Sequence, residues 1–144
     1  MNIKPVIKWS GSKRSQASEI VSKIPKHNKY FEPFLGGGSI MYAMNPSNAI
    51  CSDICEPLIK LWDVIKSDPI GLADYYREQW GRMQEEGYQV YYEIRDEFNS
   101  SFSPYNLLFL SRTCVNGLIR FNSDGQFNNS LHYSRKGINP ETLR

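Results

Sequence analysis

The sequence lacks any apolar run that approaches the length of a membrane span, and its first stretch, MNIKPVIKWSGSK, lacks the apolar core of a signal peptide. Cysteine is scarce. Cys51 and Cys55 lie four residues apart, but no second ligand pair follows them, and Cys114 stands alone. Metal-type pairing is therefore absent, and an odd number of cysteines does not form a disulfide framework. We expect a cytoplasmic protein with reduced thiols, no membrane segment and no metal site.

The charges are unevenly distributed along a chain of ordinary globular composition, with 144 residues, 40% of them apolar and 22% charged. Residues 1–30 carry seven Lys or Arg against one acid, and residues 53–97 carry eleven acids against five bases. The residues after 108 turn basic again. Two basic ends suit contact with a polyanion such as a nucleic-acid backbone. On charge alone, an ordinary solvated surface with chance clustering is the simpler interpretation.

The first half of the chain alternates between predicted strands and helices. Ser15 to Ile24 has helical apolar spacing and is followed by a proline. The segment 29–34 predicts a short strand leading into three glycines, and 39–44 predicts a helix. The segment 48–53 predicts a second strand, buried by its Ala-Ile-Cys run. Glu56 to Lys66 predicts a helix whose inner face is Leu58, Ile59, Trp62 and Ile65. This order is typical of the opening of a doubly wound α/β sheet.

The second half changes character. Asp68 to Glu86, Tyr88 to Asn99 and Pro104 to Cys114 predict three helices with no buried strand between them. From Asn116 the sequence is polar, and Ser123-Asp124-Gly125 predicts a hairpin-type turn between LIRF and QFNN. This half is predicted to be a helical and loop module inserted into the sheet. With only two evident strands, the sheet is incomplete.

The stretch YFEPFLGGGSI, residues 30–40, places three glycines directly after the first predicted strand. Adjacent glycines occur where a backbone turns tightly or a ligand comes very close. A mononucleotide P-loop needs Lys and then Ser or Thr after its last glycine, and a dinucleotide loop needs a further glycine; neither follows Gly38. Asp53 ends the second strand seventeen residues after Gly36, where an acid can accept hydrogen bonds from ribose hydroxyls. The pattern favours S-adenosylmethionine over a glycine turn that serves packing alone.

The stretch KWSGSK, residues 8–13, lies before any regular element. Trp9 could cover an adenine or methionine face, and Lys13 could pair with a carboxylate. Taken alone, the stretch is explained more simply by a core tryptophan and a surface lysine.

Four segments in the same order resemble DNA adenine-N6 methyltransferases of the Dam type: KWSGSK, FEPFLGGGSI, SDI and SRTCVNGLIRFN. The resemblance covers essentially the whole chain, and the last segment is highly specific. It implies a Rossmann-like sheet that binds S-adenosylmethionine, with an inserted target-recognition module. Ser12 stands where the family usually has a second glycine. The cofactor-binding residues that the resemblance implies are Trp9, Gly11, Lys13, Glu32, Pro33, Phe34, Gly36, Gly38 and Asp53.

The resemblance assigns the reading of double-stranded DNA to the segment VNGLIRFN. By analogy, Arg120 reads a guanine through two donors aimed at O6 and N7, a contact that discriminates by about 1–3 kcal/mol. Val115 occupies the position of a side chain that enters the base stack, where many relatives have an aromatic ring. From the residues alone, Arg120 could instead brace the turn after Asn116. The polar residues 128–135 suit DNA contacts, but equally an ordinary polar loop. The implied DNA-binding set is Arg112, Val115, Asn116, Arg120 and Asn122.

The family's Asp/Asn-Pro-Pro-Tyr/Phe motif, which holds the target amine and stacks on the flipped base, is absent from the sequence. Family order places it beyond residue 144, so we assign no catalytic residue here. We expect residues 1–66 to bind S-adenosylmethionine, residues 67–137 to recognise the DNA target, and residues 138–144 to begin the return to the catalytic domain.

The resulting hypothesis is the N-terminal part of an enzyme that methylates N6 of an extruded adenine in duplex DNA. The missing motif would come from a continued gene or a separate C-terminal half. Two alternatives stay open: an inactive cofactor- or DNA-binding remnant, and a different nucleotide-using α/β enzyme. Restriction-modification, phage self-protection and gene regulation are all compatible roles.

Overall fold

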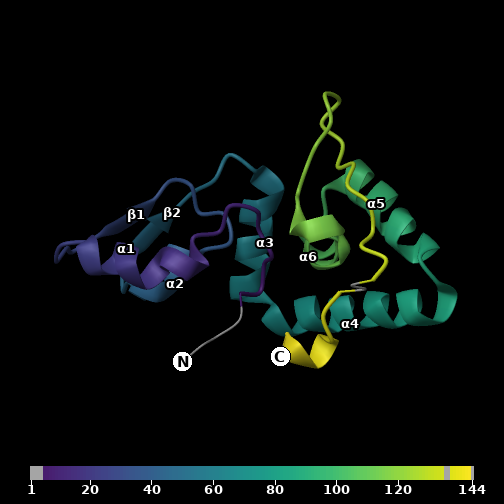
Figure 1. Ribbon diagram of the computed structural model, residues 1–144, viewed down its shortest axis with the longest axis horizontal. Helices are drawn as coiled ribbons and strands as arrows, with labels where there is room; N and C mark the ends of the chain where they lie inside the picture. The colour runs from purple at the N-terminus through teal and green to yellow at the C-terminus, as the bar shows by residue number, and fades with distance from the viewer. Residues whose placement is uncertain (1–4, 135–136, 144) are drawn as a thin grey trace.

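The chain folds into two adjoining parts with a helix between them (Figure 1). The computed structural model describes residues 5–134 and 137–143. A small parallel sheet with two short helices forms one part, and three longer helices form the other. The elements in chain order are the 3₁₀ turn η1 (Arg14–Gln16), α1 (Ala17–Lys23), β1 (Tyr30–Glu32), α2 (Ser39–Met44), β2 (Ala49–Cys51), α3 (Glu56–Ser67), α4 (Pro69–Glu86), α5 (Gln89–Ser101), α6 (Pro104–Thr113), and the 3₁₀ turns η2 (Val115–Gly117) and η3 (Pro140–Thr142). The mixed α/β architecture that the sequence predicts is confirmed.

Strands β1 and β2 pair in parallel, with Phe31 opposite Ile50. Parallel strands need a crossover, and the segment carrying α2 supplies it. The predicted burial of the second strand is wrong, because Ala49 is exposed and Ile50 is 61% exposed. Paired residues point to the same face of a sheet, and Phe31 is exposed as well. One face of this sheet is therefore left uncovered by the described residues.

Helix α3 joins the two parts through the core. Pro57 lies in its first turn, where the missing N–H has no intrahelical partner to lose. Leu58 and Leu61 are fully buried, and they belong to the same apolar cluster as Ile7 and the helices of the second part. The predicted inner face is confirmed at Leu58. Trp62 and Ile65 are half-buried and pack against the same cluster, and Ile59 is half-buried. One continuous core thus runs across the predicted division at residue 66.

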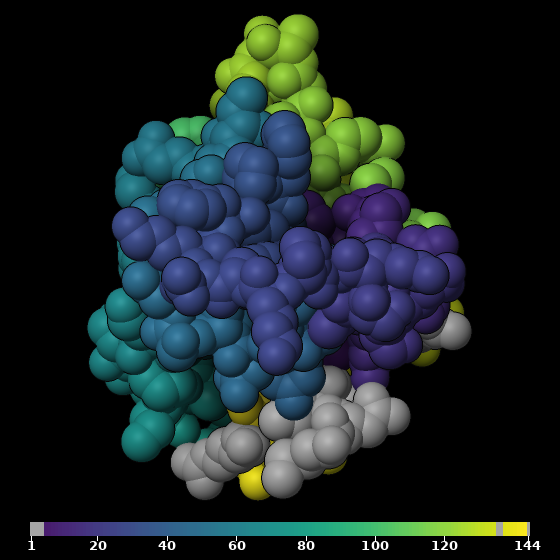
Figure 2. All heavy atoms as spheres, turned by 90° about the vertical axis from the view of Figure 1, so that its left-hand side faces the viewer, coloured from purple at the N-terminus to yellow at the C-terminus, as the bar shows by residue number. Residues whose placement is uncertain are grey.

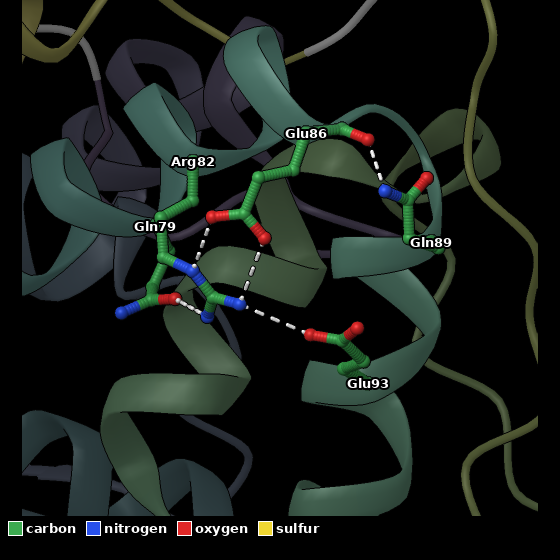
Figure 3. Close-up of polar contacts among 5 residues, drawn as sticks. All are labelled: Gln79, Arg82, Glu86, Gln89 and Glu93. Atoms are coloured by element: carbon green, nitrogen blue, oxygen red, sulfur yellow. Dashed lines mark hydrogen bonds and ion pairs between the residues drawn. The ribbon is translucent and has the colours of Figure 1, made fainter.

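Helices α4, α5 and α6 form the second part, with α6 buried on every side from Asn106 to Ser111. Its apolar run LLFL fills the centre, which explains a helix that is apolar all round. Arg82 ties α4 to α5 at the surface (Figure 3): its Nε and Nη2 atoms contact Glu86, and Nη2 also lies 3.1 Å from Glu93 Oε2. No helix in the described part of the chain is both long and apolar enough to cross a membrane.

Residues 118–128 form a hairpin that projects beyond the helices (Figure 1). Phe121 and Phe127 form an antiparallel bridge directly beside its tip. At its tip, Asn122 Oδ1 accepts hydrogen bonds from the backbone N–H groups of Asp124 and Gln126, at 3.0 and 2.9 Å. The predicted turn at residues 123–125 is confirmed.

Candidate functional site

The three glycines form a tight bend that is closed onto the end of β2. The N–H of Gly36 donates to Asp53 Oδ2 over 2.9 Å, and the N–H of Cys55 donates to Asp53 Oδ1 over 3.0 Å. The backbone adds two further bonds, from Leu35 N–H to the Ser52 carbonyl and from Gly38 N–H to the Leu35 carbonyl. Asp53 therefore fixes the bend with Oδ2 and its own loop with Oδ1, and each oxygen still has a second lone pair.

Two tryptophans, one before the bend in the sequence and one after it, pack against the bend. A Cβ atom on Gly36 would lie 2.9 Å from Trp9 Cδ1, and one on Gly38 would lie 2.6 Å from Trp62 Cζ2. Trp62 also donates from its indole N–H to the Gly36 carbonyl over 3.0 Å. With φ values of +50° and +67° in addition, Gly36 and Gly38 cannot be replaced without strain. The absence of side chains at Gly36 and Gly38 therefore makes room for the rings of Trp9 and Trp62, as well as for a ligand.

A cleft of about 200 Å³ opens beside this bend. Its walls come from the N-terminal stretch, the end of β1, the glycine bend, the start of α2 and Asp53. Figure 2 views the molecule from the side of this N-terminal part, with the hairpin rising at the top. Seven of the nine residues predicted to bind the cofactor line the cleft: Trp9, Gly11, Lys13, Glu32, Phe34, Gly36 and Asp53. Gly38 instead faces a neighbouring apolar hollow, and the exposed Pro33 lies outside both.

The cleft combines acidic groups with a lysine and exposed aromatic surface. Burial raises the pKa of Glu32, although the hydrogen bond that its Oε2 accepts from the Tyr30 hydroxyl, at 2.8 Å, acts in the opposite direction. Lys13 lies on the same cleft, and Phe34 is 85% exposed at its rim. This set can bind a ligand that carries both charges and a flat apolar ring.

Two contributors to the site were not identified from the sequence. Ser12 and Ser39 hydrogen-bond through their side-chain oxygens over 2.6 Å, which joins the N-terminal stretch to the start of α2. The sequence places Trp62 on the core face of its helix, and the structure confirms this packing and adds a hydrogen bond from its indole N–H to the Gly36 carbonyl. The serine at position 12, where the family usually has a second glycine, is the sequence feature that could have indicated the contact with Ser39. The position of Trp62 depends on how α3 is rotated, which no local pattern reveals.

The predicted DNA-binding residues gather around the hairpin and the turn before it. Arg120 is exposed, and its Nε donates to Asn128 Oδ1 over 2.8 Å on the opposite arm of the hairpin. The side-chain Oδ1 of Asn122 accepts the two hydrogen bonds that close the hairpin tip. Val115 is half-buried, and Asn116 is exposed in a left-handed conformation with φ +56°. Arg135 lies outside the described residues.

Arg112 points inward, away from these residues. Its guanidinium donates to the backbone carbonyls of Pro5 and Val6, the second over 2.6 Å from Nε, and burial lowers its pKa. Next to that segment, Lys8 packs its aliphatic stem on Gly117, where an added Cβ would lie 2.5 Å from the stem. Because Lys8 and Trp9 are neighbours, the N-terminal segment touches both the turn at Gly117 and the cleft.

Comparison with protein families gives one match, to the D12 class N6 adenine-specific DNA methyltransferases, over residues 9–142. The matched range includes the cleft, the three long helices and the hairpin. The chain belongs to this family. Membership in the methyltransferase class implies a methyl donor.

Curated relatives of the chain include further DNA methyltransferases by name. The chain is 34% identical over 149 residues to the type II methyltransferase M.MjaIII of Methanocaldococcus jannaschii, which covers 89% of this chain and 52% of that protein. It is 33% identical to the DNA adenine methylase of Serratia marcescens, over 94% of this chain and 51% of the relative. The corresponding enzyme of Escherichia coli (strain K12) is also 33% identical, over 94% of this chain and 50% of the relative. The chain therefore spans about half the length of the curated relatives it matches.

Proposed function

We propose that the chain is the cofactor-binding and DNA-recognising half of an enzyme that transfers a methyl group from S-adenosylmethionine to N6 of an extruded adenine in double-stranded DNA. One observation carries the proposal. Residues from three separate segments, typified by Trp9, Glu32 and Asp53, converge on a single cleft in a protein of the D12 class. Packing alone does not require two acids and a lysine to share a hollow with exposed aromatic rings.

The chemistry of the cleft fits S-adenosylmethionine. This cofactor supplies a methyl group on a sulfonium, and it also presents a ribose, an adenine, an ammonium and a carboxylate. The remaining lone pairs of Asp53 can accept from the ribose hydroxyls, and Lys13 can pair with the carboxylate. Glu32 provides a negative charge for the ammonium, and Trp9 and Phe34 offer ring surface to the adenine. A volume of about 200 Å³ is below the 300–1,000 Å³ of typical ligand pockets, so these residues form one wall of the site.

The hairpin is the proposed DNA-reading element. Arg120 is held against Asn128, so its guanidinium is pre-oriented to make paired hydrogen bonds to a guanine edge. Val115 and Asn116 lie on the turn at the base of the hairpin, where they would approach the target base pair. Arg112 would act indirectly, because it ties helix α6 to the N-terminal segment. Residues 67–137 would then form the inserted recognition module of a Rossmann-like methyltransferase, and residues 138–144 the return.

The remaining half of the enzyme would cover the open surface of the N-terminal part. Phe31 and Ile50 lie side by side on the uncovered sheet face, and Ile54 is 99% exposed. An apolar hollow of about 680 Å³ lies between α1, α2 and Trp62. Exposed apolar surface of this kind marks an interaction site in a folded protein. A C-terminal polypeptide carrying the Asp-Pro-Pro-Tyr motif fits it, because the relatives are about twice as long as this chain.

The proposed function is tested in two steps. In calorimetry, the 144-residue chain is expected to bind S-adenosylmethionine, and Lys13→Ala to bind it more weakly. In a methylation assay on duplex DNA, activity is expected only after a C-terminal half from a D12 relative is added. Cofactor binding without activity in any combination would favour the alternative of an inactive binding remnant, to which the missing motif also points. No cofactor binding by the chain or by the combination would overturn the proposal.

A further inference from the structure

We propose that Asn129 is the positioning residue that holds the turn Val115–Leu118 in the conformation that reads DNA. The inference rests on the proposed function of that turn. Asn129 is 6% exposed, so it is not itself available to DNA. Its side-chain Nδ2 donates to the carbonyls of Val115 and Leu118, each over 2.9 Å. One amide group therefore closes both ends of the turn.

The turn needs such support because of its backbone. Asn116 and Gly117, its two central residues, both have positive φ, at +56° and +63°. Two successive left-handed residues are typical of a type I′ turn, which asparagine followed by glycine tolerates best. The Leu118 N–H donates to the Val115 carbonyl over 3.1 Å, as that turn requires. The Asn129 amide adds a second donor to the same carbonyl, and it pairs the Leu118 carbonyl as well.

Asn129 is itself fixed from three sides. Its Oδ1 accepts from the Ser130 N–H over 2.9 Å, and its own carbonyl accepts from the hydroxyl of the fully buried Tyr91 over 2.9 Å. The Val115 N–H donates to the Ser130 carbonyl over 2.9 Å. Helix α5, the segment at residues 129–131 and the turn are thus joined at one residue, to α5 through the Asn129 backbone carbonyl and to the turn through its side-chain amide. The buried helix α5 therefore holds Asn129 in place, and Asn129 in turn fixes the position of Asn116 at the surface.

The decisive variant is Asn129→Asp, because aspartate keeps the acceptor for Ser130 and removes both donations to the turn. Asn99→Asp is the matched control. Asn99 holds the hairpin at Phe127 with the same pattern, accepting from its N–H at 2.7 Å and donating to its carbonyl at 3.1 Å. Both variants lose an amide donor to a backbone carbonyl, but only Asn129 touches residues 115–118. Asn129→Thr keeps one hydroxyl donor and serves as a partial rescue.

The readout is the sequence preference of the purified chain for duplexes selected from a randomised library, together with the salt dependence of binding and hydrogen exchange of the Leu118 amide. We expect Asn129→Asp to lower the preference ratio by about tenfold, because the Val115 carbonyl loses its second donor and the Leu118 carbonyl loses the Asn129 amide. The salt slope should not change, because no phosphate contact is removed. Leu118 exchange should accelerate in parallel. Asn129→Thr should fall between Asn129→Asp and the wild type, and Asn99→Asp should keep the ratio.

Three outcomes would overturn the inference. A folded Asn129→Asp with the wild-type preference would show that the turn does not depend on the amide, and Asn129→Thr decides the point if the aspartate variant does not fold. An equal loss in Asn99→Asp would reduce the effect to general loosening of the hairpin. A wild-type chain without any sequence preference would remove the DNA-reading role of the turn, and with it the proposed function of the module.

Discussion

The backbone N–H of Gly36 donates to Asp53 Oδ2 over 2.9 Å, so the glycine bend and the acid that follows β2 share one wall of the cleft. The bond has two consequences. It commits this amide to the protein rather than to a ligand, and it aligns the carboxylate at the cleft edge. Asp53 is therefore proposed both to stabilise the bend and to accept hydrogen bonds from the cofactor.

Asp53→Asn tests this double role. Asparagine keeps one acceptor and turns the other into a donor, which would face the N–H of Gly36 or Cys55. We expect unfolding in urea to lose about 1–3 kcal/mol, and S-adenosylmethionine affinity in calorimetry to fall by about tenfold or more. Asp63→Asn, on the exposed face of α3, should change neither quantity. Wild-type affinity in a folded Asp53→Asn protein would count against a ribose contact.

Gly38→Ala should damage the bend through sterics alone. The residue has φ +67°, and its Cβ would lie 2.6 Å from Trp62 Cζ2. We expect a loss of about 2–4 kcal/mol in unfolding free energy, from the left-handed backbone and the clash. Gly81→Ala is the control, since it lies within α4 with open space around it and should gain about 0.5–1 kcal/mol. Equal effects of the two substitutions would refute the contact with Trp62.

Much of this arrangement follows from local sequence. The glycine bend, the strand before it and Asp53 are close in sequence, and parallel pairing of adjacent strands brings them together. The three long helices also follow from apolar spacing, and their bounds differ from prediction by one or two residues. Proline at the start of α4 and α6 sets two of these bounds directly.

What sequence could not predict depends on contacts between distant residues. The segment around Ile50 has the apolar composition of a buried strand, yet its burial depends on whether another element covers that face of the sheet. Arg112 lies in a DNA-reading segment by resemblance, yet it donates to carbonyls more than a hundred residues away in sequence. The buried Asn129 is a polar residue in a polar stretch, and only the fold gives its amide two carbonyls to bind. No local pattern carries that information.

Substitutions of Arg120 can distinguish hydrogen bonding to a base from simple electrostatic attraction to DNA. We expect Arg120→Ala to lose about 1–3 kcal/mol of discrimination at one base pair, measured by competition between duplexes. Arg120→Lys keeps the charge but not the paired donors, so it should lose nearly as much discrimination while retaining affinity for random DNA. Arg77→Ala, which breaks a surface contact to Asp74 and Glu141 instead, is the control. If Arg120→Lys discriminates as well as the wild type, the contact is electrostatic only.

Cys114 predicts a loss of stability at alkaline pH. Burial raises the pKa of this thiol to about 11. Below the pKa that this thiol has in the unfolded chain, it is neutral in both states, and its contribution to the free energy of unfolding is fully present. As the pH rises through the interval up to about 11, the unfolded chain ionises first, so stability falls. Urea unfolding at pH 8 and pH 10 should show about 1 kcal/mol more loss in wild type than in Cys114→Ala.

The comparison with Cys114→Ala is needed because buried tyrosines act in the same direction. Burial raises the pKa of Tyr76 to about 12 and also raises that of Tyr91. The part of this effect that comes from tyrosine burial is common to both proteins and cancels in the difference. Identical losses in the two proteins would mean that the Cys114 thiolate is solvated in the folded state.

Arg82 should contribute modestly to stability. It joins Gln79, Glu86 and Glu93 across the connection between α4 and α5 (Figure 3), but its side chain is 36% exposed. We expect Arg82→Ala to cost about 0.5–1 kcal/mol in thermal or urea unfolding, and the cost to shrink in high salt. Lys60→Ala, which breaks the isolated pair with Glu56, should cost less. A salt-independent loss would point to packing of the arginine stem instead.

Titration of the isotope-labelled 144-residue chain with S-adenosylmethionine, followed residue by residue by NMR, is the most direct test of the cleft. The account predicts that the largest shifts fall on the Trp9 indole, Gly11, Gly36 and the Cys55 amide bonded to Asp53, with the hairpin unchanged. Shifts confined to other surfaces, or none at millimolar cofactor, would contradict it.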